Sequence, residues 1–284
     1  VVALVAGMYF DGLRLQRLVK IGGYKLSIRA VLRVIFSNYF MAMLTPGASG
    51  GAVAQVLVLR SYGVPISKGT PIVLIRTVFS IMFLVIMLPL VFLRDAIEIP
   101  YISRDMLLIF AVLAVIAALV GTYILQTKYM RQFVYNLAQR FKAHNTKDWL
   151  SKLETLNQGL GLLYKQPVQS LIVFIESGLS LLCLYCIAPA LMYAFTPDIP
   201  IIDILDRMIL LNLILYFAPT PGGTGIAEGL FVVLFSAFVP NGTVGIIAVG
   251  WRVVAEYMPF FIGMYAVLTL YGRQFVAQET SREQ

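Results

Sequence analysis

The sequence predicts an all-α integral membrane protein, a polytopic helical bundle with two inverted repeats that each contain a re-entrant helical hairpin. Composition gives the first indication, because 60% of the 284 residues are hydrophobic and only 13% are charged, whereas soluble domains are about half apolar and a quarter charged. A repeated phrase gives the second, since Thr45–Gly50 (Thr-Pro-Gly-Ala-Ser-Gly) returns as Thr220–Gly225 (Thr-Pro-Gly-Gly-Thr-Gly). Each copy is followed, about one membrane thickness later, by an arginine inside an apolar run, Arg76 or Arg252.

The apolar runs define the expected elements in chain order. The first, Val1–Phe10, is shorter than the roughly 20 residues that a span needs, so we interpret it as the truncated end of a helix that begins upstream. Two runs, residues 28–60 and 204–239, are each divided by the Thr-Pro-Gly phrase into arms mostly too short to cross, which predicts re-entrant hairpins covered by protein or a wet cavity. Four runs are long enough to span: residues 69–93, 106–126, 168–195 and 243–271.

Charged connections orient these elements. The segment Arg14–Arg33 carries six Lys and Arg residues and 128–165 carries seven, whereas 94–105 and 196–207 together hold six acids against three arginines. Basic connections favour the cytoplasmic side, so the acidic ones are expected outside. The crossings then alternate only if each hairpin returns to its own side, the first entering from the cytoplasm and the second from outside. Inverted units of this kind are typical of alternating-access transporters.

The predicted division of the chain follows from this topology. Residues 1–126 form the first membrane repeat, and residues 168–284 form the second repeat with a short polar tail. Residues 127–167 form a cytoplasmic connection with two amphipathic helical faces. These faces lie either in the membrane interface or on the protein as a lid over its cytoplasmic face, and both alternatives place the connection at the membrane surface.

Charged side chains within apolar runs are the first candidate site residues. Arg252 and Glu256 are four residues apart and can pair on one helix, either as a structural ion pair or with Arg252 gripping a headgroup phosphate. Glu228 could pair with Arg252, bind a headgroup ammonium, or complement its helix dipole. Arg76 occupies the equivalent place in the first repeat and lies close enough to the surface to snorkel. Glu176 could pair with Arg76 or serve as a protonatable site for ion coupling.

The two Thr-Pro-Gly turns supply the remaining candidates. Helix N-termini with free amides attract phosphate or carboxylate, so we expect N–H groups at Gly50, Gly51 and Gly225 to offer an anion site. Glycine also lets two hairpins, or a hairpin and a lipid, approach closely. The other turn residues assigned to substrate binding are Thr45, Gly47, Ser49, Thr220, Gly222, Gly223 and Thr224. No metal or cofactor is expected, because Cys183 and Cys186 are typical buried apolar cysteines and the one histidine, His144, is expected to be solvated.

These motifs resemble a known family. Asn38, the phrase Thr45–Gly51, Gln55, Gly63 and Arg76, followed by Pro219–Glu228 and Trp251-Arg252, resemble the lysylphosphatidylglycerol synthase transmembrane-region family over nearly the whole chain. This is the flippase domain of bacterial multiple peptide resistance factors and of many stand-alone membrane proteins. The resemblance implies translocation of an anionic or aminoacylated phospholipid, such as lysyl-phosphatidylglycerol, across the bacterial cytoplasmic membrane. It also implies that Glu228, Arg252 and the glycine turns are functional positions; Ala52 departs from the acid of many relatives.

Two further functions compete with a phospholipid translocase. One is the transmembrane part of a lipid-headgroup-modifying enzyme, for which a soluble catalytic domain in the full-length gene would argue. The other is an ion-coupled small-solute transporter, favoured by a closed, water-filled cavity rather than a groove open to lipid. We expect the chain itself to be no enzyme and to bind no nucleic acid, since its basic residues lie in short segments between apolar runs. Expected partners are the membrane, the phospholipid substrate, and either further copies of the chain or a separately encoded synthase domain.

Overall fold

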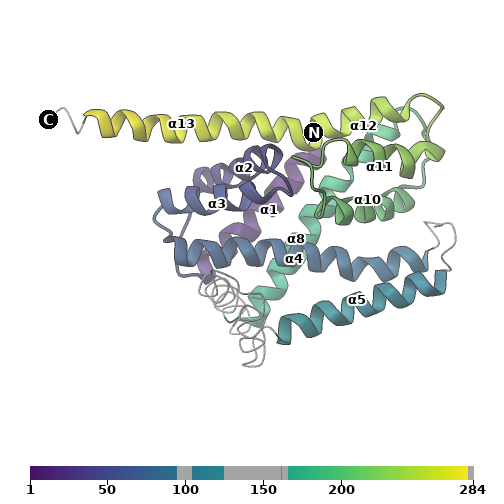
Figure 1. Ribbon diagram of the computed structural model, residues 1–284, viewed down its shortest axis with the longest axis horizontal. Coiled ribbons are helices and arrows are strands. Elements are labelled where there is room, and N and C mark those ends of the chain that lie inside the picture. The colour runs from purple at the N-terminus through teal and green to yellow at the C-terminus, as the bar shows by residue number, and fades with distance from the viewer. Residues whose placement is uncertain (95–103, 125–160, 162–165, 281–284) are drawn as a thin grey trace, which may run out of the picture.

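The computed structural model describes residues 1–94, 104–124, 161 and 166–280, and every regular element within them is helical (Figure 1). This confirms the predicted all-α class. The predicted connection at 127–167 lies almost wholly outside the described residues, and the division into repeats stays a prediction. The helices are α1 (Val2–Ile21), α2 (Ile28–Leu44), α3 (Ser49–Ser61), α4 (Ile66–Leu93), α5 (Arg104–Ile124), α8 (Pro167–Tyr185), α9 (Ile187–Met192), α10 (Ile201–Leu215), α11 (Ile226–Phe235), α12 (Val244–Arg252) and α13 (Met258–Thr280), with a 3₁₀ turn η1 (Ser236–Phe238) and a π turn η2 (Val253–Tyr257).

Three helical segments among the described residues are long and apolar enough to cross a membrane. They are Ile66–Leu93, Pro167–Met192 and Val244–Leu270. They match the spans predicted at 69–93, 168–195 and 243–271, with ends that differ by a few residues. The fourth predicted span, 106–126, corresponds to α5, whose described apolar part, Asp105–Ala117, is shorter than a crossing.

Helix α1 corrects the predicted boundary between membrane and cytoplasm near the N-terminus. The helix continues beyond the apolar run to Ile21 and includes Arg14 and Arg17, which the charge pattern had placed in a basic connection. Arg14 is buried, with 6% of its surface exposed. The prediction of a basic loop was wrong because carboxylates inside the fold neutralise these arginines, which therefore do not belong to a solvated loop.

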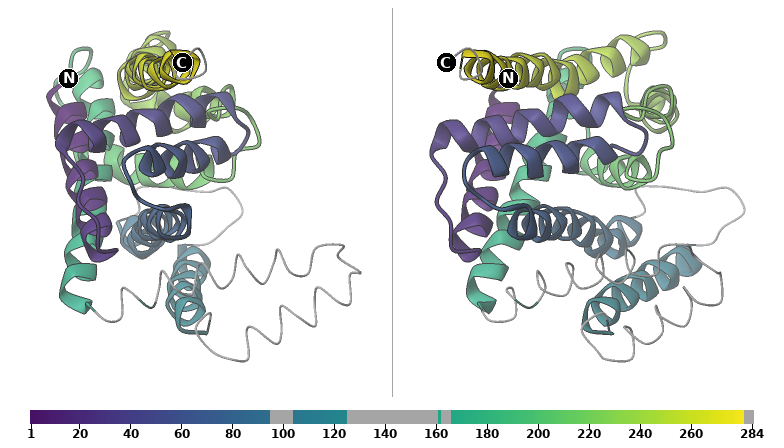
Figure 2. Two further views of the ribbon diagram at one scale, coloured as in Figure 1. Left: turned by 90° about the vertical axis from the view of Figure 1, so that its left-hand side faces the viewer. Right: turned by 60° about the vertical axis from the view of Figure 1, so that its left-hand side comes forward.

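Two helical hairpins form the centre of the molecule. Hairpin A consists of α2 and α3, and hairpin B consists of α10 and α11. They enter from opposite ends and their turns meet in the middle, between α4 and α13 (Figure 1). Figure 2 shows the same layers from two other directions, with α13 on one side of hairpin A, α4 on the other, and α5 beyond α4.

The two turns begin with the same backbone conformation. Gly47 and Gly222 have φ of 59° and 58°, in the left-handed region that glycine adopts without strain. Ser49 Oγ donates to the Pro46 carbonyl over 3.1 Å, and Thr224 Oγ1 donates to the Pro221 carbonyl over 2.8 Å. The turns touch through an isolated antiparallel bridge between Pro46 and Pro221.

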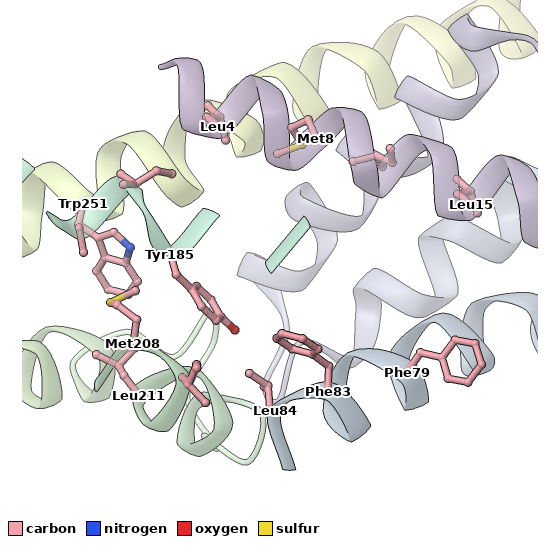
Figure 3. Close-up of a cluster of buried hydrophobic side chains, with 14 of the residues drawn as sticks. Leu4, Met8, Leu15, Phe79, Phe83, Leu84, Tyr185, Met208, Leu211 and Trp251 are labelled. Carbon is pink, nitrogen blue, oxygen red and sulfur yellow. The ribbon is translucent and has the colours of Figure 1, made fainter. Parts of the chain in front are cut away.

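Close helix contacts hold these layers around the hairpins. A Cβ on Gly263 of α13 would lie 2.1 Å from the Phe36 carbonyl oxygen of α2, so only glycine fits there. A Cβ on Gly178 of α8 would lie 2.4 Å from the ring of Phe83 in α4. Small residues that admit close approach are typical of helix packing in membranes. The apolar core between them unites residues of α1, α4, α8, α10 and α12 (Figure 3).

Candidate functional site

A cavity of about 450 Å³ lies where the turns of hairpins A and B meet, and residues of α1, α4, α8 and α12 also line it. Its charged lining residues are Asp11, Arg14, Arg76 and Glu256. Isolated charges are costly at membrane depth unless they are paired or solvated. The partners of these four residues therefore decide what the cavity can bind.

Asp11 joins two arginines beside the cavity. Its carboxylate accepts from Arg14 Nε at 2.5 Å and from Arg76 Nε at 3.1 Å, and Arg76 Nη2 donates to its second oxygen. Arg14 Nη1 also donates to Ser80 Oγ at 2.7 Å. All three charged side chains are buried. Two guanidiniums face one carboxylate, so this group carries one excess positive charge.

Hairpin A is attached to this group through amide side chains. Arg76 Nη1 donates to Gln55 Oε1 of α3, and Gln55 Nε2 donates to Asn38 Oδ1 of α2 over 2.7 Å. A Cβ on Gly51 would lie 2.4 Å from Asn38 Oδ1, so glycine there makes room for the amide. Together Asp11, Arg14, Arg76, Gln55 and Asn38 form what we call the Asp11 cluster.

A second group, the Arg252 cluster, holds the turn of hairpin B. Arg252 is 1% exposed, and its Nε donates to Glu228 at 2.8 Å while Nη1 donates to Glu256. Its Nη2 donates to the Gly222 carbonyl at 2.9 Å. These contacts confirm that Arg252 pairs with both Glu256 and Glu228. Two carboxylates face one guanidinium, so this group carries one excess negative charge.

The local backbone structure positions Glu256 and Glu228, the two acids of the Arg252 cluster. Glu256 lies in the π turn η2, directly after Arg252, and π turns occur frequently at functional sites. Glu228 lies in the first turn of α11 and also accepts from the Gly225 amide at 2.7 Å. Trp251 stacks on Phe231 with ring centroids 5.3 Å apart, which joins α12 to α11 beside the ion pairs.

The cavity lies between the two clusters. Arg14, Arg76 and Asp11 line it from the first, and Glu256 lines it from the second. Tyr39 of α2 also lines it. The cavity therefore has a cationic region and an anionic region.

Two of the alternatives that the sequence left open, for Glu176 and for Arg76, do not occur in the structure. Glu176 does not pair with Arg76; its Oε1 accepts from Arg17 Nη2 of α1 at 2.7 Å, and Arg17 also contacts Gln169. Arg76 does not snorkel to the surface, because it is 5% exposed and bound to Asp11 and Gln55. The acidic partner of Arg76 and the basic partner of Glu176, Asp11 and Arg17, both come from α1, whose second half the charge pattern had assigned to a basic connection.

The expectation that the backbone amides at the two turns are free is also wrong, because all three are hydrogen-bonded. The Gly50 amide donates to Thr45 Oγ1 at 2.9 Å and the Gly51 amide donates to the Ala48 carbonyl at 3.1 Å. The Gly225 amide is bonded to Glu228, as described above. Side-chain and carbonyl caps satisfy these donors locally, as at other helix N-termini. An anion at these turns would have to displace an existing acceptor.

The turn residues divide into two sets. Those that line the cavity are Gly47, Ser49, Thr220, Gly222 and Gly223. Those that do not, and instead shape the turns or cap the following helices, are Thr45, Gly50, Gly51, Thr224 and Gly225. The substrate-binding role of either set stays a prediction. No group of three or more His, Cys, Asp or Glu side chains suited to a metal ion occurs within residues 1–94, 104–124 and 166–280.

Sequence reasoning missed Asp11, Arg14 and Tyr185 of the cavity wall. The spacing Asp11–Arg14, three residues apart directly after an apolar run, was the available signal, because residues at this spacing pair on a helix. Tyr185 gave no such signal, since one tyrosine in an apolar run is typical of any membrane helix.

Comparison with known proteins places the chain in one family. A sequence model of the family described as "Lysylphosphatidylglycerol synthase TM region" matches residues 1–263. The chain belongs to this family. As a member of the lysylphosphatidylglycerol synthase TM region family, it is similar to a UPF0104 membrane protein of Archaeoglobus fulgidus, with 22% identity over 268 residues that cover 90% of this chain and 80% of the relative. No solved structure matches the chain.

Proposed function

We propose that this protein is a phospholipid translocase that moves an anionic or aminoacylated phospholipid, such as lysyl-phosphatidylglycerol, across the bacterial cytoplasmic membrane. The observation that carries the proposal is the cavity between the hairpin turns, with its charged and hydroxyl-bearing lining. Its volume of about 450 Å³ lies within the usual range for small-molecule sites, roughly 300 to 1,000 Å³. A headgroup fits such a volume while the acyl chains stay in the bilayer.

An inverted-repeat architecture with re-entrant hairpins is part of this proposal. Equivalent residues of the two motif copies, Pro46 and Pro221, form an antiparallel bridge, and such a pair is related by a local twofold axis. The hairpins also enter from opposite ends of the molecule (Figure 1). A binding site near the bilayer midplane at the repeat interface is typical of transporters built this way.

The charge distribution supports a headgroup that carries charges of both signs. A phosphate would face Arg14 and Arg76, because guanidinium binds phosphate oxygens strongly. An ammonium of an aminoacylated headgroup would face Glu256 across the cavity. Arg252 contributes by fixing Glu256 and the turn of hairpin B, since three of its nitrogens already have acceptors.

A lipid-scrambling assay tests the function. Reconstituted protein should accelerate bleaching by dithionite of inner-leaflet fluorescent phosphatidylglycerol relative to protein-free liposomes. Arg76→Lys keeps the charge but loses the planar grip, and we expect lipid movement roughly 10 to 100 times slower. Arg60→Lys is the matched control, because Arg60 lies exposed on α3 and does not line the cavity.

The outcomes separate the competing functions. Wild-type protein that leaves the bleaching rate at the protein-free value contradicts the translocase. Uptake of a water-soluble fluorescent solute without any lipid movement would favour the solute transporter instead. Equal loss of activity in the Arg76 and Arg60 variants would contradict the assignment of the cavity as the lipid pathway. It would not contradict the translocase function itself.

A further inference from the structure

Two hydroxyl groups on the cavity wall are buried without a hydrogen-bond partner among the described residues, Tyr185 Oη and Thr220 Oγ1. Tyr185 is 3% exposed and extends from the end of α8. Figure 3 shows its hydroxyl oxygen pointing away from Trp251 and toward the side of α4 that carries Phe83 and Leu84. A buried hydroxyl that pairs with nothing destabilises a fold, so each calls for an explanation.

The repeated motif provides an internal comparison for Thr220. Its equivalent in the first copy, Thr45, is fully used: Oγ1 donates to the Met41 carbonyl at 2.8 Å and accepts from the Gly50 amide at 2.9 Å. Thr45 directly follows α2 and is therefore a helix cap in hairpin A, whereas α10 already ends at Leu215 and the Thr220 hydroxyl in hairpin B has no partner among the described residues. A capping role does not account for Thr220.

The surroundings of the two hydroxyls indicate what they bind. Both line the cavity that Arg14 and Arg76 also line. A Tyr or Thr hydroxyl can donate to an oxygen anion, and bonds to charged acceptors are the stronger ones. The combination of two neutral donors with an excess positive charge matches a phosphate group.

We propose that Tyr185 and Thr220 donate hydrogen bonds to the phosphate of the translocated phospholipid, beside the guanidiniums of Arg14 and Arg76. This inference rests on the proposed function and adds its phosphate-contacting residues. It accounts for the two buried hydroxyls without partners among the described residues, because their hydrogen bonds form only with the lipid bound.

Thermal unfolding of the detergent-solubilised chain tests this assignment. The probe is dihexanoyl-phosphatidylglycerol, and dihexanoylglycerol serves as the probe without phosphate. We expect the first to raise the melting temperature of the wild-type protein and the second to leave it unchanged. Tyr185→Phe and Thr220→Val should each weaken the apparent affinity for the phospholipid roughly 10-fold or more, the usual cost of losing a hydrogen bond to a charged group.

Ligand-free stability separates a binding role from a structural one. Tyr185→Phe and Thr220→Val should melt at or above the wild-type temperature without lipid, because they remove unpaired buried groups. Thr45→Val should melt lower, because it loses two hydrogen bonds. Tyr265→Phe is the matched control for affinity, since Tyr265 is 72% exposed on α13 and lies outside the cavity.

Each result decides something different. Unchanged lipid affinity in both hydroxyl variants, or a clear loss of ligand-free stability in them, overturns the assignment even where lipid movement is normal. The protein could also bind lipid in a way that depends on Tyr185 and yet move no lipid. That result would support the phosphate site and contradict the translocase function. Equal stabilisation by inorganic phosphate alone supports the phosphate contact and assigns its source to a soluble anion.

Discussion

Asp11 is the residue whose negative charge compensates the buried arginines beside the cavity. Its carboxylate is 3% exposed and contacts Arg14 and Arg76, which come from α1 and α4. Without it, two guanidiniums would remain buried with only Ser80 and Gln55 as partners. Removing one partner of a buried ion pair is much more costly than the pair itself is stabilising.

Asp11→Asn should therefore lower the free energy of unfolding by about 3 to 5 kcal/mol, because it leaves uncompensated buried charge. The measurement is the melting temperature of the purified variant in detergent. Asp198→Asn is the control, since Asp198 is exposed between α9 and α10. Two variants that melt together would show that Asp11 does not stabilise the arginines.

At this scale the sequence predicted the two partners of Arg252, which are Glu256 and Glu228, but none of the pairs between residues farther apart along the chain. Arg252 and Glu256 are one helical turn apart, so their pairing follows from helix geometry alone. Asp11 and Arg76 are separated by 65 residues, and Arg17 and Glu176 by 159. Nothing in the local pattern specifies which helix faces which, so these pairs required the tertiary structure.

Helices α2 and α13 pack more closely than ordinary side chains allow. Gly263 lies against the Phe36 carbonyl oxygen, and the rings of Phe40 and Phe260 are 5.3 Å apart along the same contact. Because α13 follows η2, this contact also fixes where Glu256 lies relative to hairpin A. The position of α13 is thus linked to that of Glu256, one of the charged residues that line the cavity.

Gly263→Ala should separate α13 from α2, because the added Cβ would lie 2.1 Å from backbone oxygen that cannot rotate away. We expect a loss of about 1 to 3 kcal/mol in unfolding free energy, the typical cost of overpacking. The same change at Gly245 of α12, where nothing lies within 4 Å, should be neutral or slightly stabilising. Melting curves of the two variants in detergent give the comparison; a loss at Gly245 as large as at Gly263 would contradict the packing argument.

The turns of the two hairpins could be predicted from the residue types alone. The Pro-Gly clusters of the repeated phrase marked the turns of both hairpins, because neither residue continues a helix readily. The end of α1 was not predictable in this way. Arg14 and Arg17 look like loop residues until their carboxylate partners on α1 and α8 are known.

Exposed residues at the ends of the two hairpins allow a direct test of the proposed membrane topology. Lys25 precedes hairpin A and Ser61 ends it, and Asp198 and Asn241 flank hairpin B. All four residues are exposed. Re-entrant hairpins place both ends of each hairpin on one side of the membrane, and inversion places the two hairpins on opposite sides.

Single cysteines at these four positions, after Cys183 and Cys186 are replaced by Ala, should be labelled in two classes by a membrane-impermeant maleimide on intact cells. We expect Asp198→Cys and Asn241→Cys to react, and Lys25→Cys and Ser61→Cys to react only after the membrane is opened. Reaction of Ser61→Cys without reaction of Lys25→Cys would mean that hairpin A crosses the membrane, which contradicts the inverted repeat.

The contact between Pro46 and Pro221 has a consequence for the solvation of the protein interior. Proline carries no amide hydrogen, so neither residue exposes a donor when the two turns part. An unsatisfied donor in hydrocarbon costs several kcal/mol, and most other residue types would incur that penalty at this point. Where the two turns meet, therefore, only the amides on either side of the prolines would need new acceptors if the turns separated.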